Sequence, residues 1–252
     1  MCLIAFAVDA HPDYKLILAA NRDEFYKRPT SPAQYWPDQP SILAGRDEQA
    51  GGTWMAISKS GRFSAVTNYR DLSNIKDDAI SRGDLPVNFL MQDVTPEDYM
   101  KQVHEIADAY NGFNLLCWAD DQMCHYSNYE GKVNIIEPGI YGLSNALLNT
   151  PWPKVKKLRS SFSSAIEQKF DHESLLSLLV DGTAAPDEEL PDTGVGLEWE
   201  KMLSPVCIRS ENYGTCCSTI VTISRSGVVE FTERTYPVGN RKEGDAFFEF
   251  QV

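Results

Sequence analysis

Short apolar runs separated by turn residues predict β-hairpins near both ends of the chain. The predicted strand pairs are residues 3–8 with 15–20, 53–57 with 63–69, and 217–223 with 227–232. Residues 29–52 contain four prolines and end in two glycines, so we predict a long structured loop there rather than a strand or helix.

The middle of the chain changes to helical spacing. Apolar residues recur at three- and four-residue steps between positions 88 and 110, and Thr95 followed by Pro96 is typical of a helix start. We predict an amphipathic helix over residues 153–170 and a shorter one over residues 172–180. Strands are predicted at residues 113–119, 123–129 and 133–136, and directly before Gly142.

Together these runs indicate the fold class. Most predicted strands are continuous apolar stretches, which indicates sheets that are covered on both faces. Hairpins at both ends with helices between them predict an α+β fold of antiparallel sheet with segregated helices. Two packed sheets with helices outside satisfy the pattern, and other layer arrangements remain open. The acidic, Pro- and Gly-containing residues 181–200 predict a mobile surface loop, either a plain linker or a lid.

Charge excludes several classes of function. The 252-residue chain has 23 Lys and Arg against 36 Asp and Glu, a formal net charge of −13. Nucleic-acid binding needs a basic face, which this balance does not supply. We interpret the one basic cluster as a solvated side of a helix; it consists of Lys154, Lys156, Lys157 and Arg159. The acidic balance argues against binding to anionic membrane surfaces. No run approaches the ~20 apolar residues of a membrane span.

Cysteine and histidine usage predicts neither a disulfide framework nor a metal site. The six cysteines show no CxxC spacing, and the four histidines show no ligand spacing. The apolar start lacks the basic segment of a signal peptide and meets Asp9 at once. We therefore expect reduced thiols, a cytoplasmic location and no cofactor, while the oligomeric state stays open.

Cys2, directly after the start methionine, is the leading candidate for chemistry. If Met1 is removed, Cys2 has a thiol and a free α-amine on one residue. An α-amine has a pKa of about 7.7–8.0 and can act as a base near neutral pH, which is a known way to activate a nucleophile. A buried apolar cysteine is the alternative interpretation.

The tetrapeptide Asn21-Arg22-Asp23-Glu24 follows the second apolar run, across the first predicted hairpin from Cys2. An arginine beside a thiol lowers the thiol pKa because it favours the thiolate. A nearby carboxylate can hold an α-amine and orient it as a base. A surface turn with a local ion pair is the alternative.

Polar clusters also follow other predicted strands. Asn68 and Asn145 each lie where a strand gives way to a loop. Asparagine amides suit an oxyanion hole, although asparagine is also common in turns. Thr215 and Cys216 enter the last hairpin. Adjacent Cys216 and Cys217 either line a pocket, form a redox pair or face opposite sides of a strand.

Six ordered blocks of sequence resemble one known family. The blocks are Cys2, residues 21–24, residues 51–54, residues 67–70, residues 142–145 and residues 213–215. They closely resemble the NRDE family, also called the transport and Golgi organisation family. That family is similar to the cysteine N-terminal-nucleophile hydrolases, such as penicillin V acylase and bile salt hydrolase. The resemblance spans nearly the whole chain and implies a single domain over residues 1–252 with a four-layer αββα sandwich.

The resemblance implies roles for individual residues. Cys2 would be nucleophile and base, Arg22 the thiolate partner and Asp23 the partner of the amine. Asn68 would donate to the oxyanion, and Asn145 would position the substrate or the α-amine. The pocket candidates are Glu24, Trp54, Tyr69, Thr215 and Cys216.

Two departures from the acylase pattern bear on these roles. Acylases usually place the supporting Asp three residues after the Arg, whereas Asp23 is adjacent to Arg22. Strict alternation along a strand would put these two on opposite faces, so Glu24 is an alternative partner of Arg22. Cys216 stands where family members often have arginine.

The implied function is hydrolysis of the C–N amide bond of a small molecule through Cys2. The alternative is a non-catalytic binding or trafficking protein for a lipophilic ligand such as haem, acyl-coenzyme A or a lipid. Because fold resemblance does not settle function, both hypotheses stay open.

Overall fold

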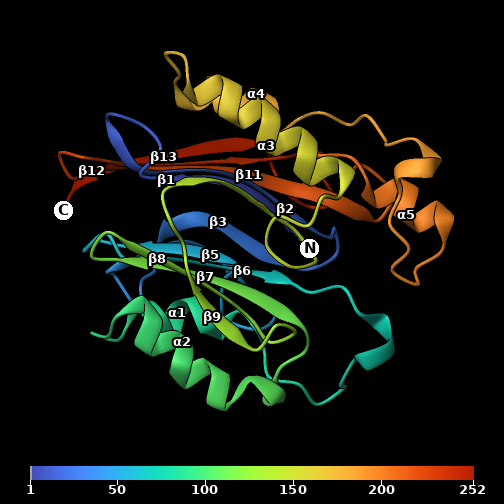
Figure 1. Ribbon diagram of the computed structural model, residues 1–252, viewed down its shortest axis with the longest axis horizontal. Coiled ribbons are helices and arrows are strands. Elements are labelled where there is room, and N and C mark those ends of the chain that lie inside the picture. The colour runs from blue at the N-terminus through green and yellow to red at the C-terminus, as the bar shows by residue number, and fades with distance from the viewer. Residues whose placement is uncertain (1) are drawn as a thin grey trace.

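Two stacked antiparallel sheets form the centre of the computed structural model, which describes residues 2–252 (Figure 1). The expected removal of Met1 concerns a residue outside the described part. The six-stranded sheet has the order β10 (Gly139–Leu143), β1 (Cys2–Val8), β2 (Tyr14–Phe25), β11 (Tyr213–Ser224), β12 (Val228–Thr235) and β13 (Gly244–Gln251). The seven-stranded sheet runs in sequence order: β3 (Thr30–Tyr35), β4 (Ile42–Asp47), β5 (Met55–Ser58), β6 (Phe63–Asn68), β7 (Phe113–Ala119), β8 (Gln122–Ser127) and β9 (Lys132–Ile135).

Helices cover the outer face of each sheet. The helices α3 (Pro153–Ile166) and α4 (His172–Leu178) pack on the six-stranded sheet, and α1 (Asp84–Leu90) and α2 (Pro96–Glu105) pack on the seven-stranded sheet. A fifth short helix, α5 (Leu197–Leu203), lies at the edge of the upper layer in Figure 1. Three short 3₁₀ turns complete the elements: η1 (Leu72–Asn74), η2 (Ala107–Ala109) and η3 (Asp187–Glu189). The predicted four-layer αββα sandwich is confirmed.

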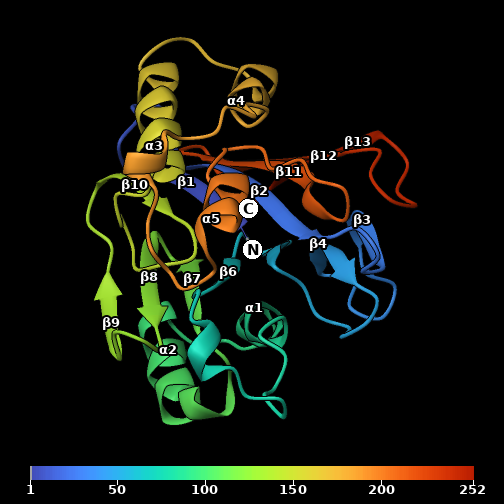
Figure 2. The same cartoon turned by 90° about the vertical axis from the view of Figure 1, so that its right-hand side faces the viewer.

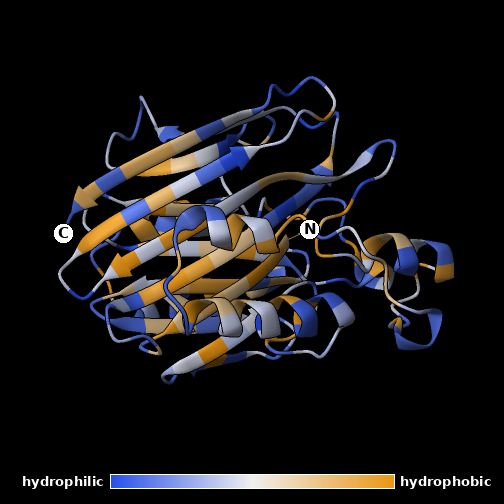
Figure 3. Cartoon of the chain, turned by 90° about the horizontal axis from the view of Figure 1, so that it is seen from above, coloured by the Kyte–Doolittle hydropathy of each residue, from blue (hydrophilic) through white to orange (hydrophobic). Residues whose placement is uncertain are grey.

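Strand β1 shows why the apolar runs are continuous. Ile4 and Phe6 face the other sheet and belong to the core between the sheets. Leu3 and Ala5 face the opposite way and pack in the core beneath α3 and α4. Every residue of β1 is buried, because both faces of the sheet are covered. Figure 3 shows hydrophobic colour running along the strands and hydrophilic colour in the peripheral loops.

Local signals fix several helix starts. The Thr95 hydroxyl accepts a hydrogen bond from the Asp98 amide (3.1 Å), and Pro96 occupies the first turn of α2. Asp171 and Ser174 form a capping box at the start of α4. Both predicted starts are therefore confirmed, although the helical region predicted over 88–110 is divided between α1, α2 and η2.

The loop prediction for residues 29–52 is wrong, because β3 and β4 lie within it. The prolines misled the prediction: β3 is an edge strand, where Pro32 removes no hydrogen bond that a neighbouring strand needs. Ala33 and Trp36 are buried along this segment. Residues 181–200 also contain more structure than a loop, namely η3 and the first part of α5. Strand β13 was not predicted at all.

The fold brings several polar segments to one end of the sandwich. The start of β1 pairs with the end of β2, with Cys2 opposite Arg22. Strand β6 of the other sheet ends at Asn68, and Figure 2 places the N-terminus between the two sheets at this end.

Within residues 2–252, none of the helices is both long and apolar enough to cross a lipid bilayer.

Candidate functional site

A cavity of about 280 Å³ opens where β1, β2 and β6 meet. Its lining includes Cys2, Arg22, Asp23, Glu24, Trp54, Asn68, Arg28, Asp47 and Arg82. We call this cavity the Cys2 pocket. It gathers four of the five predicted catalytic residues and two of the five predicted pocket residues. Arg28, Asp47 and Arg82 were not predicted, because each follows or precedes a loop whose path the sequence alone does not give.

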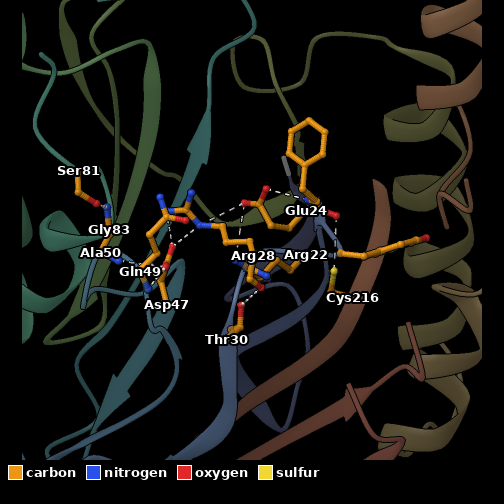
Figure 4. A network of polar contacts seen from close by, with 12 residues as sticks. Arg22, Glu24, Arg28, Thr30, Asp47, Gln49, Ala50, Ser81, Gly83 and Cys216 are labelled. Carbon is orange, nitrogen blue, oxygen red and sulfur yellow. Dashed lines mark hydrogen bonds and ion pairs between the residues drawn. The ribbon is translucent and has the colours of Figure 1, made fainter. Parts of the chain in front are cut away.

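Arg22 lies beside Cys2 and is held on two sides. Its guanidinium stacks over the Trp54 ring, 4.3 Å from the ring centre. Its Nη2 lies 3.7 Å from Glu24 Oε2, so Glu24 is the carboxylate that pairs with Arg22. Glu24 also lies within 4.0 Å of Arg28, which forms a 2.7 Å ion pair with Asp47 (Figure 4). Arg22 Nη1 is buried and has no hydrogen-bond partner within residues 2–252.

Arg22 lowers the Cys2 pKa as predicted, but the net shift of that pKa is upward. Burial raises the pKa of the Cys2 thiol, and the nearby Asp23 and Glu24 charges raise it further. Arg22 acts in the predicted direction and lowers the Cys2 pKa, but burial is the larger effect. Cys2 as a whole residue is only 7 % exposed. Chemistry at Cys2 therefore needs a base to remove the thiol proton.

Asp23 faces away from Arg22, toward the helices. Its Oδ1 accepts a hydrogen bond of 2.7 Å from the Thr215 hydroxyl, and the same hydroxyl accepts one from the Ile208 amide. Burial raises the pKa of Asp23, and the positive charge of Lys154 is the largest effect that opposes this rise. Thr215 thus positions Asp23 and does not line the Cys2 pocket.

Lys154 is a functional candidate, and its predicted position on a solvated helix face is wrong. Lys156, Lys157 and Arg159 are exposed as predicted, but Lys154 is 3 % exposed. Its Nζ has no hydrogen-bond partner within residues 2–252. Burial lowers its pKa to about 8, while the charges of Asp23 and Cys2 act in the opposite direction. The sequence contained a sign of this burial. Lys154 lies four residues before Leu158 and eight before Phe162, so it belongs to the same buried face of α3.

Asn68 and Asn145 have different surroundings. Asn68 lines the Cys2 pocket, whereas Asn145 is fully buried and does not. The Asn145 Nδ2 donates to the Asn68 carbonyl oxygen (2.9 Å), and its Oδ1 accepts from the Ser144 hydroxyl. That hydroxyl also donates to the Cys2 carbonyl oxygen (3.0 Å). Asn145 and Ser144 therefore tie the Cys2 and Asn68 backbones together.

Comparison with known proteins assigns the family. The sequence profile described as Transport and Golgi organisation 2 matches residues 1–237. The chain belongs to this family. The mouse transport and Golgi organization 2 homolog is 39 % identical over 93 % of each chain. The human homolog is 40 % identical, again over 93 % of each chain.

Solved structures similar to this member of the transport and Golgi organisation 2 family include a hydrolase. A C2A mutant of conjugated bile acid hydrolase from Clostridium perfringens superposes with a TM-score of 0.50 at 9 % identity. The superposition covers 99 % of this chain and 97 % of that one. At this identity the likeness concerns the fold alone.

Two remaining pocket candidates lie elsewhere in this transport and Golgi organisation 2 chain. Tyr69 stacks on Tyr129, with ring centres 3.8 Å apart, outside the Cys2 pocket. Cys216 lies at a β-bulge and lines a separate cavity together with Cys217. All six cysteines are free thiols. No group of three or more His, Cys, Asp or Glu within residues 2–252 is arranged to hold a metal ion.

The acidic segment 181–200 is anchored to the same end of the fold. Glu200 forms a 2.8 Å ion pair with Arg70, and both side chains are at most 5 % exposed. The Glu200 carboxylate also accepts a hydrogen bond from the Thr193 amide (2.8 Å), and Arg70 stacks over Trp152. The C-terminal end of the segment is therefore fixed to the fold, unlike a plain linker.

Proposed function

We propose that this chain hydrolyses the C–N amide bond of a small molecule, with Cys2 as the nucleophile. The observation that carries the proposal is the register of β1 and β2, which sets Cys2 opposite Arg22 in the wall of a cavity. Asn68, from the other sheet, lines the same cavity and supplies an uncharged amide donor. The fold shared with a hydrolase agrees with this proposal but does not carry it.

The proposed reaction has two steps. The Cys2 sulfur attacks the amide carbonyl carbon, and the Asn68 amide donates to the oxygen as negative charge develops on it. The C–N bond then breaks, the amine leaves with a proton, and an acyl-thioester remains on Cys2. Water hydrolyses the thioester, which releases a carboxylic acid and returns the thiol.

The base is the α-amine of Cys2, so removal of Met1 is part of the proposal. An α-amine titrates near pH 8 and can take the proton that the buried thiol keeps. Asp23, whose charge acts on Cys2, is the proposed partner of that amine. Lys154 is a positioning residue in this scheme, because its charge favours the ionised form of Asp23.

Limiting iodoacetamide at pH 7, followed by digestion and peptide mass measurement, tests the nucleophile first. The native-start protein should lack Met1, and Cys2 should react faster than the other five thiols despite its burial. Cys117 and Cys124 are internal controls, because burial raises both thiol pKa values, that of Cys124 to about 11. Retention of Met1, or a Cys2 rate equal to the rates of these controls, would contradict the proposal.

A screen of small amides, followed by amine release, then tests the reaction itself. Cys2→Ala should abolish release on any amide that the wild type cleaves, and Cys207→Ala should leave it unchanged. Cys207 is the matched control, since it is a buried thiol outside the Cys2 pocket. Full turnover by the Cys2→Ala variant would exclude Cys2 chemistry.

A non-catalytic binding role is the second candidate, and the raised pKa of Cys2 is the observation that favours it. A protonated thiol is a poor nucleophile and a compatible wall for an uncharged part of a ligand. Haem, acyl-coenzyme A or a lipid would be the ligand class. For haem in the Cys2 pocket, Cys2 is the axial-ligand candidate, because no histidine is among the lining residues that the structure describes. Ligation would require the iron to displace the proton that the thiol keeps.

A Soret-band titration of wild type against Cys2→Ala tests the haem version. Saturable binding that the substitution removes would support it, and identical curves would exclude it. For this role, as for the enzyme, the six free thiols lead us to propose a reducing compartment such as the cytoplasm.

A further inference from the structure

A second cavity of about 460 Å³ shares Arg22 and Arg28 with the Cys2 pocket. These two arginines line both cavities, whereas Lys27, Arg241 and Lys242 line only the second one. We call the second cavity the basic pocket, defined by Lys27, Arg28, Arg241 and Lys242. None of the roles proposed above uses it.

The charge of the basic pocket is opposite to that of the chain. The whole sequence has more acidic than basic residues and a net charge of −13. The pocket lining, in contrast, contains five Lys or Arg side chains and two acidic ones, Glu48 and Glu233. A local concentration of cations in an acidic protein produces a field that attracts anions into that cavity.

Most of this positive charge is not neutralised by carboxylates. Arg22 and Arg28 have Glu24 and Asp47 beside them. The Arg241 guanidinium instead donates to the carbonyl oxygens of Tyr26 (3.1 Å) and Arg28 (2.7 Å). These neutral acceptors fix the guanidinium in place and leave its charge uncancelled. Within residues 2–252, Lys27, Arg241 and Lys242 form no ion pair.

The two acidic residues of the lining cancel only part of this charge. Glu48 keeps one negative charge, because the Ser31 hydroxyl that bonds to it is neutral, and this is fewer than the three unpaired cations Lys27, Arg241 and Lys242. Glu233 is buried and accepts a hydrogen bond of 2.7 Å from the Ala33 amide. Burial raises the pKa of Glu233 to about 7, so its negative charge is partial near neutral pH.

Arg22 adds a further cation to the wall that the two cavities share. Arg22 Nη1 is buried and lacks a hydrogen-bond partner in the described part of the chain. A buried guanidinium N–H without a partner is costly, and an oxygen anion is the group that satisfies it best. Both cavities reach Arg22, so an anion in the basic pocket would lie beside the Cys2 pocket.

We propose that the basic pocket binds the anionic group, a phosphate or a carboxylate, of a small organic molecule. The remaining lining is uncharged and includes Tyr26, Pro29, Pro32 and Cys216, which suits an uncharged body attached to the anion. The volume falls within the range of small-molecule sites. This binding does not require Cys2 chemistry, so it stands or falls separately from the proposed hydrolysis.

Calorimetric titration with phenyl phosphate, benzoate and neutral benzamide tests the proposal. The three probes share one ring, so only the head group differs. We expect saturable binding of at least one anion, weakened at ~0.15 M salt because exposed charges are screened, and none of benzamide. The comparison of phenyl phosphate with benzoate shows whether the pocket prefers a phosphate or a carboxylate. Absence of saturable binding by both anions would overturn the proposal.

Paired variants separate the pocket from the general field of the protein. Lys27→Glu with Lys242→Glu reverses two exposed rim charges and should weaken binding by about tenfold or more. Lys132→Glu with Lys169→Glu makes the same change in net charge at exposed positions outside the pocket and should leave binding within about twofold. Equal losses of anion affinity in both double variants would contradict binding at the basic pocket. Cys2→Ala should bind as the wild type does.

Discussion

The last residues of β2 separate two regions of different character. Arg22 and Glu24 face the open space between the sheets, where a cavity and several arginines meet. Asn21 faces the helices, where its amide is bonded to the Leu179 and Val206 carbonyls. Asp23 bonds to Thr215 on the same side and also reaches the lining of the Cys2 pocket. One tetrapeptide therefore supplies an open, cation-rich region and a closed, buried region. The reason is the two-residue period of a strand.

Each region contains a buried charged group whose pKa burial shifts strongly. On the closed side this is Lys154, whose pKa is lowered to about 8. On the open side it is Glu233, whose pKa is raised to about 7. Folded proteins rarely keep such groups for stability, and strongly shifted pKa values cluster at functional sites. The two regions should therefore respond to pH in opposite ways.

The largest expected effect lies on the closed side, at the ion pair of Glu200 with Arg70. Glu200→Gln removes the carboxylate charge opposite a buried guanidinium, and we expect a loss of about 3–5 kcal/mol in the free energy of unfolding. Urea unfolding at pH 7 measures it. Lys201→Gln is the control, since the Lys201–Asp187 pair is about half exposed and should contribute nothing measurable. Similar losses in both variants would contradict the contrast between a closed and a solvated region.

Lys154→Met should stabilise the protein by about 3 kcal/mol at pH 7. The folded pKa of about 8 lies below the ordinary 10.5, so the unfolded chain binds more protons between these values. Stability of the wild type should therefore rise as pH increases from about 8 to 10.5, and this rise should vanish in the variant. Lys156→Met, on the exposed side of the same helix, should keep it. A destabilised Lys154→Met protein would show that the ammonium supports the fold.

Glu233→Gln should stabilise the protein by up to about 3 kcal/mol at pH 8 and have little effect at pH 4.5. Between the ordinary pKa of 4.5 and the folded value of about 7, the folded protein keeps a proton that the unfolded chain releases. Wild-type stability should thus fall as pH rises through this window. Arg22, Cys217 and the Ala33 amide face the carboxyl group. Denaturation at both pH values measures the change in stability, with Glu230→Gln as the control. If stability falls with pH as steeply in Glu233→Gln as in the wild type, Glu233 is not the group responsible.

The smallest expected effect comes from breaking the contact of Trp54 with Arg22 in the open region. A double-mutant cycle of Trp54→Leu and Arg22→Met should give a coupling energy of about 0.5–2 kcal/mol. The same cycle read out as the Cys2 alkylation rate reports whether the stack holds Arg22 beside the thiol. Strict additivity in both readouts would mean that the stack is incidental.

Much of the fold followed from the apolar pattern, and the failures have physical causes. Buried runs such as that of β1 identified sheets covered on both faces. Strands β3 and β13 were missed because edge strands tolerate proline and exposed side chains. The alternation of Arg22 and Asp23 was readable from the sequence, so the pairing of Arg22 with Glu24 was foreseen as an alternative.

The candidate site was less readable. Arg28, Asp47 and Arg82 reach the Cys2 pocket only through loops, whose paths local patterns do not determine. The effect of Arg22 on the Cys2 pKa was predictable, but the larger effect of burial was not, because sequence gives neighbours along the chain and not depth of burial. The prediction for Lys154 was wrong because it rested on the charge of the side chain. The spacing of Lys154 from Leu158 and Phe162 places it on the buried face of α3.

The burial of Cys2 has a practical consequence for anyone producing the protein. Any residue that precedes Cys2 joins the chain at a position only 7 % exposed. The opposite terminus is different, because Val252 is 48 % exposed and lies at the far end of the sandwich from the N-terminus (Figure 1). Affinity tags and fluorescent fusions therefore belong after Val252, and a sample that keeps an N-terminal tag cannot test the hydrolysis proposed for Cys2.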